Sequence, residues 1–404
     1  MDFEWKQRIV FMFVMTTPVL ALCGQGLPQG GTINWSKNPN RVRLLHEFQA
    51  SQQNLEDSEV RADTFPLPLC EPSLPLSEKI RKSFDSRRHW MECPSLWEIR
   101  DQGACSAWAV GVASVLTDRY CIASRGKDQW RISEQDLLNC APSRENSGYI
   151  SCQSVAIPEV WDYVTKNGVV TGGYFRSGMG CQPTTMEPCY GMKSSSCNSI
   201  PPEDAATCRS SCTNPRYNRS YENDKQKIAG SCGMKMTNLE EETNDDAIKA
   251  EIYKNGPVLA VMRLYDDLHE YDGRVSVVNG SGAMYQNSHG ISAPHVLHPV
   301  KIVGWDSVPV EGNGDVGYWI VANSWGYAWG GLGGFFRVRM SSDMPELGAW
   351  IATDVSWPVI STSSPQPASD LAESSSYSFL INHILRKFRI SITFPGNNFH
   401  PNDV

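Results

Sequence analysis

Residues 100–108 read RDQGACSAW, and they lead into the helix that organises the first half of the chain. From there on, apolar residues recur at the i, i+4, i+7 and i+8 spacing that places them on one face of a helix, and they are Trp108, Val112, Val115 and Leu116. We expect this face to be buried. Ala107 stands directly before Trp108, at the point where the helical pattern begins.

The rest of the chain divides into a helical part and a β part. Residues 157–161 predict a second helix, with Pro158 in the first turn, where its missing N–H is harmless. Residues 245–255 predict a third helix, which ends at Gly256-Pro257. After it, short apolar runs rich in β-branched residues predict strands at 258–264, 299–305, 318–322 and 335–340. A helical lobe followed by a β lobe, with a functional cleft between them, is an α+β fold.

The composition excludes some classes of function. With 404 residues, of which 41% are hydrophobic, the chain can bury the core of one large domain or of two lobes. The net charge of −8 provides no basic field that would recruit nucleic acid, so we expect no nucleic-acid partner. The sequence has no C-x-x-C pair, and we expect neither a metal site nor a cofactor.

The N-terminal segment has the pattern of a secretory signal peptide. Lys6 and Arg8 precede an apolar run at 9–22 that is shorter than the ~20 residues needed to span a bilayer, so we interpret residues 1–24 as cleaved rather than as an anchor. Thirteen cysteines fit an oxidising compartment. Three glycosylation sequons agree with this route, at Asn34, Asn218 and Asn279. We therefore expect the protein in the secretory pathway, outside the cell or in lysosomes.

Composition also predicts the domain boundaries. Residues 25–79 are polar and patchy, as in a pro-region, and residues 80–358 form the folded body, with nearly all the tryptophans and cysteines. Residues 359–404 are a Ser/Pro-rich linker, which cannot bury enough apolar surface to fold, and a C-terminal tail. Within the tail, 379–394 mixes Phe, Ile and Leu with three basic residues. It predicts either an unstructured tail or a helix that binds a membrane surface or a partner; membrane binding would make the protein a membrane-associated scaffold.

Three residues of the folded body match the needs of cysteine catalysis. Such catalysis uses a thiolate, a histidine, a group that orients the histidine, and donors that face the oxyanion. His298 stands at the head of a predicted strand, and Asn323 lies beside a tryptophan that can shield its hydrogen bond. Gln102 is a candidate for the oxyanion donor.

Five stretches carry a resemblance to a known family, namely 83–87 SFDSR, 98–103 EIRDQG, 117–122 TDRYCI, 251–258 EIYKNGPV and 318–325 YWIVANSW. They occur in unbroken order, and residues 80–358 resemble cathepsin B-like members of the papain family of cysteine peptidases. The resemblance implies a papain-like, disulfide-rich fold with a helical lobe and a β-barrel-like lobe, in a monomer. It also implies a peptide or protein ligand in the cleft between the lobes.

The resemblance implies a set of disulfides as well. It pairs Cys93 with Cys121, Cys105 with Cys152, Cys140 with Cys208, Cys181 with Cys212, and Cys189 with Cys197. Cys23, Cys70 and Cys232 have no partner in this scheme. Cys70 resembles the thiol of the family's propeptide, which supports the interpretation of residues 25–79 as a pro-region.

The catalytic cysteine of the family has no counterpart in this sequence. In the papain family the catalytic cysteine directly precedes the tryptophan, and Ala107 has that position here. Cys105 stands two positions earlier, a displacement of several Å that catalysis does not tolerate. Ser106 is one residue out of register, and a serine needs stronger activation by a base. Gln102 is also one residue closer to Trp108 than in the family, so we expect a distorted oxyanion hole.

Other substrate-binding positions differ from the family too. They are 152–155 CQSV in place of a glycine-rich ledge, Leu297 in place of the glycine before the histidine, Tyr190-Gly191 in place of two histidines of the occluding loop, and Ala352 near the floor of the specificity pocket. With the thiolate absent, we interpret His298 and Asn323 as a buried hydrogen-bonded pair. His269, His289 and His295 lie in loop-like sequence and are interpreted as solvated.

The sequence therefore predicts a pseudoprotease that acts by binding. This hypothesis expects no peptide turnover and no labelling by active-site probes of cysteine peptidases. The alternative is an active cysteine-type endopeptidase whose sequence is misassembled near Ser106, for example at a splice junction, and whose transcript encodes a Cys-Trp pair.

Overall fold

The computed structural model describes residues 70, 81–103, 107–141, 156–189, 207–235, 243–271, 284–285, 296–310, 314–340 and 351–361. The chain divides into two units, 1–56 and 57–404, and every described residue belongs to the second. The expected signal peptide, the pro-region apart from Cys70, and the C-terminal tail beyond residue 361 lie outside the described residues. No helix in the described part of the chain is long and apolar enough to cross a membrane.

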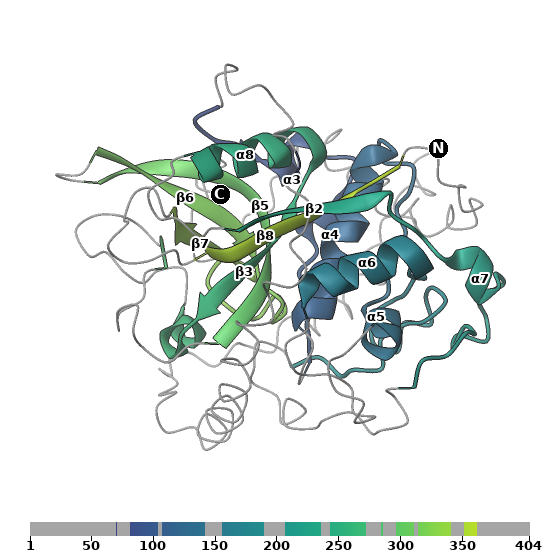
Figure 1. The fold of residues 1–404 in the computed structure, drawn as a ribbon. Coiled ribbons are helices and arrows are strands. Elements are labelled where there is room, and N and C mark those ends of the chain that lie inside the picture. Colours follow the sequence, from purple (N-terminus) through teal and green to yellow (C-terminus); the bar gives the residue numbers. More distant parts are fainter. Residues whose placement is uncertain are drawn as a thin grey trace, which may run out of the picture. The chain divides into compact units, whose positions relative to one another are not determined.

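The helical lobe is built around the helix that follows Gln102. Helix α4 (Ala107–Ala123), α5 (Glu134–Cys140) and α6 (Ile157–Asn167) belong to the same half of the fold (Figure 1), and their buried side chains form one core cluster. Helix α5 begins after Ser133, whose hydroxyl accepts a 3.0 Å hydrogen bond from the Asp136 amide and satisfies a donor of the first turn. Helix α6 opens with Pro158, as predicted. There are three shorter helices in this part of the chain and after it, η2 (Pro94–Trp97), which packs on α4, α3 (Ser86–His89), which lies beside β1 and β5, and α7 (Tyr221–Asp224).

The second lobe is a sheet whose strands follow the order β2-β8-β3-β5-β6-β7-β4, with β1 paired to β5 off this path. The path has two ends among the described strands, so the β lobe is an open sheet there (Figure 1). Neighbouring strands run antiparallel except β4 and β7. Their bounds are β1 Phe84–Asp85, β2 Gly230–Lys235, β3 Val258–Leu264, β4 Met284–Tyr285, β5 Val296–Val310, β6 Gly314–Ala322, β7 Phe335–Arg339 and β8 Ile351–Val359.

The seven helices and strands that the sequence predicts are all present among the described elements. The four predicted strands are confirmed as β3, β5, β6 and β7, and the third predicted helix is confirmed as α8 (Thr243–Asn255). The sequence does not predict β2 and β8, nor the short helix η5 (Asp266–Glu270) that follows β3. The α+β fold of two lobes is confirmed.

Helix α4 connects the two lobes. Residues 108–121 are buried on every side, rather than on the one predicted face, because the sheet packs on the face that α5 leaves open. A Cβ atom at Gly111 would lie 3.6 Å from Cβ of Pro299 in β5. Asp118 Oδ2 lies 2.6 Å from Lys301 Nζ, and both side chains are buried. These contacts fix α4 along β5 and so determine where its first residue lies.

Disulfides join the described segments to one another. They are Cys93–Cys121, Cys140–Cys208, Cys181–Cys212 and Cys70–Cys232, the last of which the sequence leaves unassigned. Cys189 is disulfide-bonded as well. Its expected partner Cys197 lies outside the described residues, as do Cys105 and Cys152.

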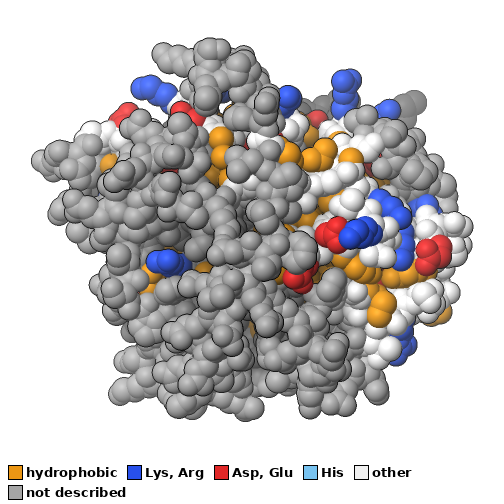
Figure 2. Space-filling view, viewed as in Figure 1, with side chains coloured by type: hydrophobic (Ala, Val, Ile, Leu, Met, Phe, Trp, Pro, Cys, Tyr) orange, Lys and Arg blue, Asp and Glu red, His pale blue; other side chains and the backbone are white. Residues whose placement is uncertain are grey.

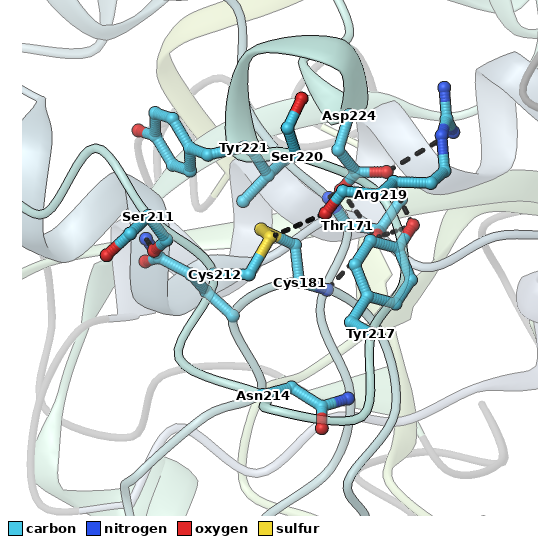
Figure 3. Close-up of a disulfide and its surroundings, with 12 residues drawn as sticks. Thr171, Cys181, Ser211, Cys212, Asn214, Tyr217, Arg219, Ser220, Tyr221 and Asp224 are labelled. Carbon is cyan, nitrogen blue, oxygen red and sulfur yellow. Dashed lines mark hydrogen bonds and ion pairs between the residues drawn. A yellow bond between two sulfur atoms is a disulfide. The ribbon is translucent and has the colours of Figure 1, made fainter.

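The Cys181–Cys212 bridge belongs to a polar cluster (Figure 3). Cys212 Sγ contacts the carbonyl oxygen of Arg219 at 3.4 Å. Asp224, which is fully buried, accepts 2.7 Å hydrogen bonds from both the amide and the hydroxyl of Thr171. The Arg219 guanidinium lies 3.3 Å from the same carboxylate and offsets its charge. The cluster holds the loop before α7 against the helical lobe.

The described surface carries charges of both signs. On the face drawn in Figure 2, Lys and Arg side chains are interspersed with Asp and Glu side chains over the described residues. Exposed pairs such as Lys166 and Asp162, 2.7 Å apart, balance each other locally and contribute little stability. No field of a single sign forms on the described part of this face.

Candidate active site

The first residues of β5 bring His298 next to Asn323, which follows β6. His298 Nε2 lies 2.9 Å from Asn323 Oδ1, and both residues are buried. The same oxygen accepts a 2.7 Å hydrogen bond from the Ser324 amide. Because an amide oxygen only accepts, a neutral His298 carries its proton on Nε2 and keeps its lone pair on Nδ1. The structure thus places the two residues as the hydrogen-bonded pair that the sequence predicts.

Burial determines the charge of His298. Its pKa is lowered from 6.5 to about 4, mainly because burial removes the imidazolium from water. The hydrogen bond to Asn323 opposes this shift, and the nearby His269 adds to it. Among the described residues, no negatively charged group raises the pKa of His298 again. His298 is therefore neutral at pH 7, and its Nδ1 is able to accept a proton.

Aromatic rings cover the pair. The Trp325 ring centroid lies 5.3 Å from that of His298, and Trp325 is buried. His269, from η5, stacks on Trp325 at 4.6 Å with the planes 9° apart, and Trp329 meets Trp325 edge-on at 5.0 Å. The interpretation of His269 as solvated is wrong, because the indole face covers its ring and leaves it half-buried. Sequence reasoning missed His269 and Trp329 because no local pattern marks either residue.

Gln102 is held beside this pair by Ser324. The backbone N–H of Gln102 donates a 2.8 Å hydrogen bond to the Ser324 carbonyl oxygen. The Ser324 hydroxyl donates a 2.6 Å hydrogen bond to the side-chain oxygen Oε1 of Gln102. Since oxygen and nitrogen lie on opposite sides of a carboxamide, the NH₂ group of Gln102 points away from Ser324. A backbone bridge between Asp101 and Trp325 joins the same two segments. Ser324 therefore holds Gln102 next to Asn323.

Ala107 is the first residue of α4 and is half-buried. It lies one helical turn before Gly111, so both residues occupy the same face of the helix. Gly111 faces Pro299, the residue after His298. The methyl group of Ala107 thus lies on the side of α4 that faces the first residues of β5.

The other predicted positions are described only in part. Leu297 is half-buried and packs against the core cluster of the helical lobe, next to His298. Ala352 belongs to β8, and Asn218 is exposed. The remaining positions lie outside the described residues, namely Asn34, Cys105, Ser106, 153–155, Tyr190-Gly191, Asn279, His289 and His295.

The described residues bring together an imidazole and two carboxamides and include no nucleophile at this place. His298 has a lone pair on Nδ1, Asn323 Oδ1 accepts at its Nε2, and Gln102 is held nearby by Ser324. Residue 107 supplies only a methyl group. The described residues include no group of three or more His, Cys, Asp or Glu side chains that could hold a metal ion.

Known proteins share this sequence pattern and fold. Residues 80–358 match the model of the family described as papain family cysteine protease. The chain is 35% identical over 262 residues to a gut-specific cysteine proteinase of Caenorhabditis elegans, which covers 65% of this chain and 69% of that protein. It is 34% identical over 267 residues to cathepsin B-like cysteine proteinase 4 of the same organism, with 65% and 71% of the two chains covered. The solved structure of proCathepsin B S9 from Trypanosoma congolense is similar with a TM-score of 0.52 and 27% identity, over 74% of this chain and 82% of that chain.

Proposed function

Because the chain belongs to the papain family of cysteine proteases, we propose that it is a cathepsin B-like pseudoprotease that binds a peptide or protein ligand without hydrolysing it. The observation that carries this proposal is the side chain at the start of α4. Ala107 directly precedes Trp108, the position of the family's catalytic cysteine, and its methyl group lies on the side that faces β5. A methyl group neither attacks a carbonyl carbon nor forms a thioester.

The charge of His298 supports the same proposal. In a cysteine peptidase the thiolate and the imidazolium stabilise each other. The pKa of His298, about 4, is that of a buried imidazole with no anion beside it in the described residues. His298 and Asn323 then act as a neutral hydrogen-bonded pair under Trp325.

The remaining groups suit a bound peptide. The papain fold has a substrate-binding cleft between its lobes. Gln102 is held beside Asn323 through Ser324, and Leu297 adds apolar surface beside His298. We propose that the ligand is a peptide segment or a protein loop and that a monomer binds it in the secretory pathway, outside the cell or in lysosomes. Asn218, which is exposed, is then a site of glycosylation.

Turnover by the full-length protein tests the first half of the proposal. Neither casein nor a fluorogenic peptide substrate of cysteine peptidases is expected to be cleaved between pH 5 and pH 7. Hydrolysis that is abolished by an epoxide inhibitor of cysteine peptidases would contradict the proposal that the protein does not catalyse.

Binding of fluorescently labelled casein peptides, followed by anisotropy, tests the second half. Ala107→Phe is expected to weaken binding, because the larger ring fills the site at the start of α4. The matched control is Ala123→Phe, which changes a half-buried alanine at the other end of the same helix and is expected to leave binding unchanged. Equal binding by both variants would contradict a ligand site next to Ala107.

A second candidate function is an active cysteine-type endopeptidase. It is favoured by the relatives, which are named proteinases, and it requires that the sequence is misassembled near Ser106. Sequencing the transcript across residues 103–108 separates the two candidates. A Cys-Trp pair supports the endopeptidase, and the Ala107-Trp108 pair supports the pseudoprotease.

A further inference from the structure

We infer that the Cys70–Cys232 disulfide keeps the pro-region covalently attached to the folded body after the chain is cut between them. The bridge joins residues 162 positions apart, one in the expected pro-region and one in the sheet. Cleavage of the peptide chain after Cys70 then leaves a molecule of two disulfide-linked chains. Release of the pro-region requires two different reactions, hydrolysis and reduction.

Cys232 is a rigid anchor for this bridge. It lies in β2, is 2% exposed, and pairs with Trp357 of β8 in a ladder that spans the whole of β2. Cys70 is half-buried. A reducing thiolate must attack one of the two sulfur atoms, and Cys70 offers the more accessible side.

The anchor lies far from the candidate active site. His298 pairs with Met262 of β3, whereas Cys232 is three strands from β5 and about four residues further along the sheet. With strands ~4.8 Å apart and ~3.3 Å per residue, the separation from His298 is roughly 20 Å. The bridge therefore tethers the pro-region without itself filling the site.

The residues directly before the buried body are suited to cleavage. Arg81 and Lys82 are exposed, and Ser83 after them is exposed too. The buried body begins at Phe84, which is 6% exposed and pairs with Trp305 in β5. Exposed, basic backbone just outside a folded body is where a trypsin-like protease cuts most readily.

Two balanced reactions separate the chains. Hydrolysis of one peptide bond consumes one water and yields a carboxylate and an amine. A dithiol reductant then gives two electrons and two protons to the bridge, so that Cys70 and Cys232 become thiols and the reductant becomes a disulfide. In an oxidising compartment only the first reaction proceeds, and the pro-region stays at a high effective concentration beside the body.

Limited trypsin digestion of the full-length protein, purified from an oxidising secretory host, tests this inference. After a cut at Arg81 or Lys82, SDS gels without reductant are expected to show one species in which both fragments stay joined, and its intact mass is expected to be that of the uncut chain plus one water. Dithiothreitol is expected to release the N-terminal fragment. A fragment that separates in SDS without reductant would overturn the inference.

Two variants and a peptide map show whether the Cys70–Cys232 bridge is what retains the fragment. Cys70→Ser, which leaves the sheet unchanged, is expected to release the fragment without reductant, whereas a Cys93→Ser/Cys121→Ser control is expected to retain it. Complete tryptic digestion of the alkylated, unreduced wild type is expected to yield peptide 62–79 linked to peptide 228–235. Alkylation of both Cys70 and Cys232 in that sample would overturn the inference even if no cut occurs near residue 82.

Discussion

Replacing His298 with glutamine is expected to remove a measurable part of the pH dependence of stability. The pKa of His298 is about 4 in the folded protein, against 6.5 for an unperturbed histidine. As the pH falls below 6.5, the unfolded chain therefore takes up a proton first, and the free energy of unfolding decreases until the pH reaches about 4. Above pH 6.5 the residue is neutral in both states and has no effect.

The size of the effect follows from the two pKa values. Between pH 6.5 and pH 5 the unfolded chain is mostly protonated at this residue and the folded protein is not. Each pH unit in this window costs about 1.4 kcal/mol, so the loss between pH 7.5 and pH 5 amounts to about 2 kcal/mol. A thiolate beside the ring would stabilise the imidazolium and shrink this loss.

Urea unfolding followed by tryptophan fluorescence, at pH 7.5 and at pH 5, measures the loss. The other titratable groups are present in wild type and variant and cancel in the difference, so His298→Gln is expected to lose about 2 kcal/mol less than wild type. Equal losses in wild type and His298→Gln would contradict the lowered pKa of His298, as would an NMR titration of His298 near 6.5.

Three further changes test the packing around the site by urea unfolding. Asp118→Asn leaves the buried Lys301 ammonium, 2.6 Å away, without its counter-charge and is expected to cost about 3–5 kcal/mol; a loss below 1 kcal/mol would contradict the pairing. Cys93→Ser/Cys121→Ser removes a disulfide that closes a loop with a sequence separation of 28, and it is expected to cost about 3.5 kcal/mol of stability. An unchanged urea midpoint would show that the disulfide is not formed. Trp161→Phe removes a 3.0 Å hydrogen bond from the indole N–H to a buried hydroxyl of β8 and is expected to cost about 1–3 kcal/mol of stability. Unchanged stability would contradict this hydrogen bond.

The sequence predicts elements well where the local pattern and the tertiary contacts agree. Residues 258–264 form β3 with the predicted bounds, because their apolar, β-branched run is buried on both faces. The strand at 299–305 is predicted too short, since β5 extends over Val296–Val310. Its first residues pair with β3 and its last with β6, which no local pattern encodes.

Strands that depend on distant partners were missed. β2 reads GSCGMK, with two glycines and no alternation, and it is stable because it pairs along its whole length with β8, more than 100 residues away. β8 contains Pro358 and Asp354, both uncommon in strands. Such pairing is decided by the tertiary structure.

The candidate site likewise has residues that the sequence predicts and contacts that it does not. His298, Asn323 and Gln102 stand in motifs, so their place in one site follows from the sequence and its resemblance. The stack of His269 on Trp325 and the Cys70–Cys232 bridge are encoded by single residues far apart in the chain. A pairing of lone cysteines cannot be read from spacing.

Labelling with an epoxide active-site probe, followed by mass spectrometry, tests whether Ala107 stands where the family's nucleophile would be. We expect that wild type takes up no probe, and that Ala107→Cys takes it up at position 107, since His298 Nδ1 is able to accept the proton of a thiol there. Loss of that labelling in the double variant Ala107→Cys/His298→Gln would show that the two residues act together. Probe-labelled wild type, at Cys105 or any other native residue, would contradict this expectation.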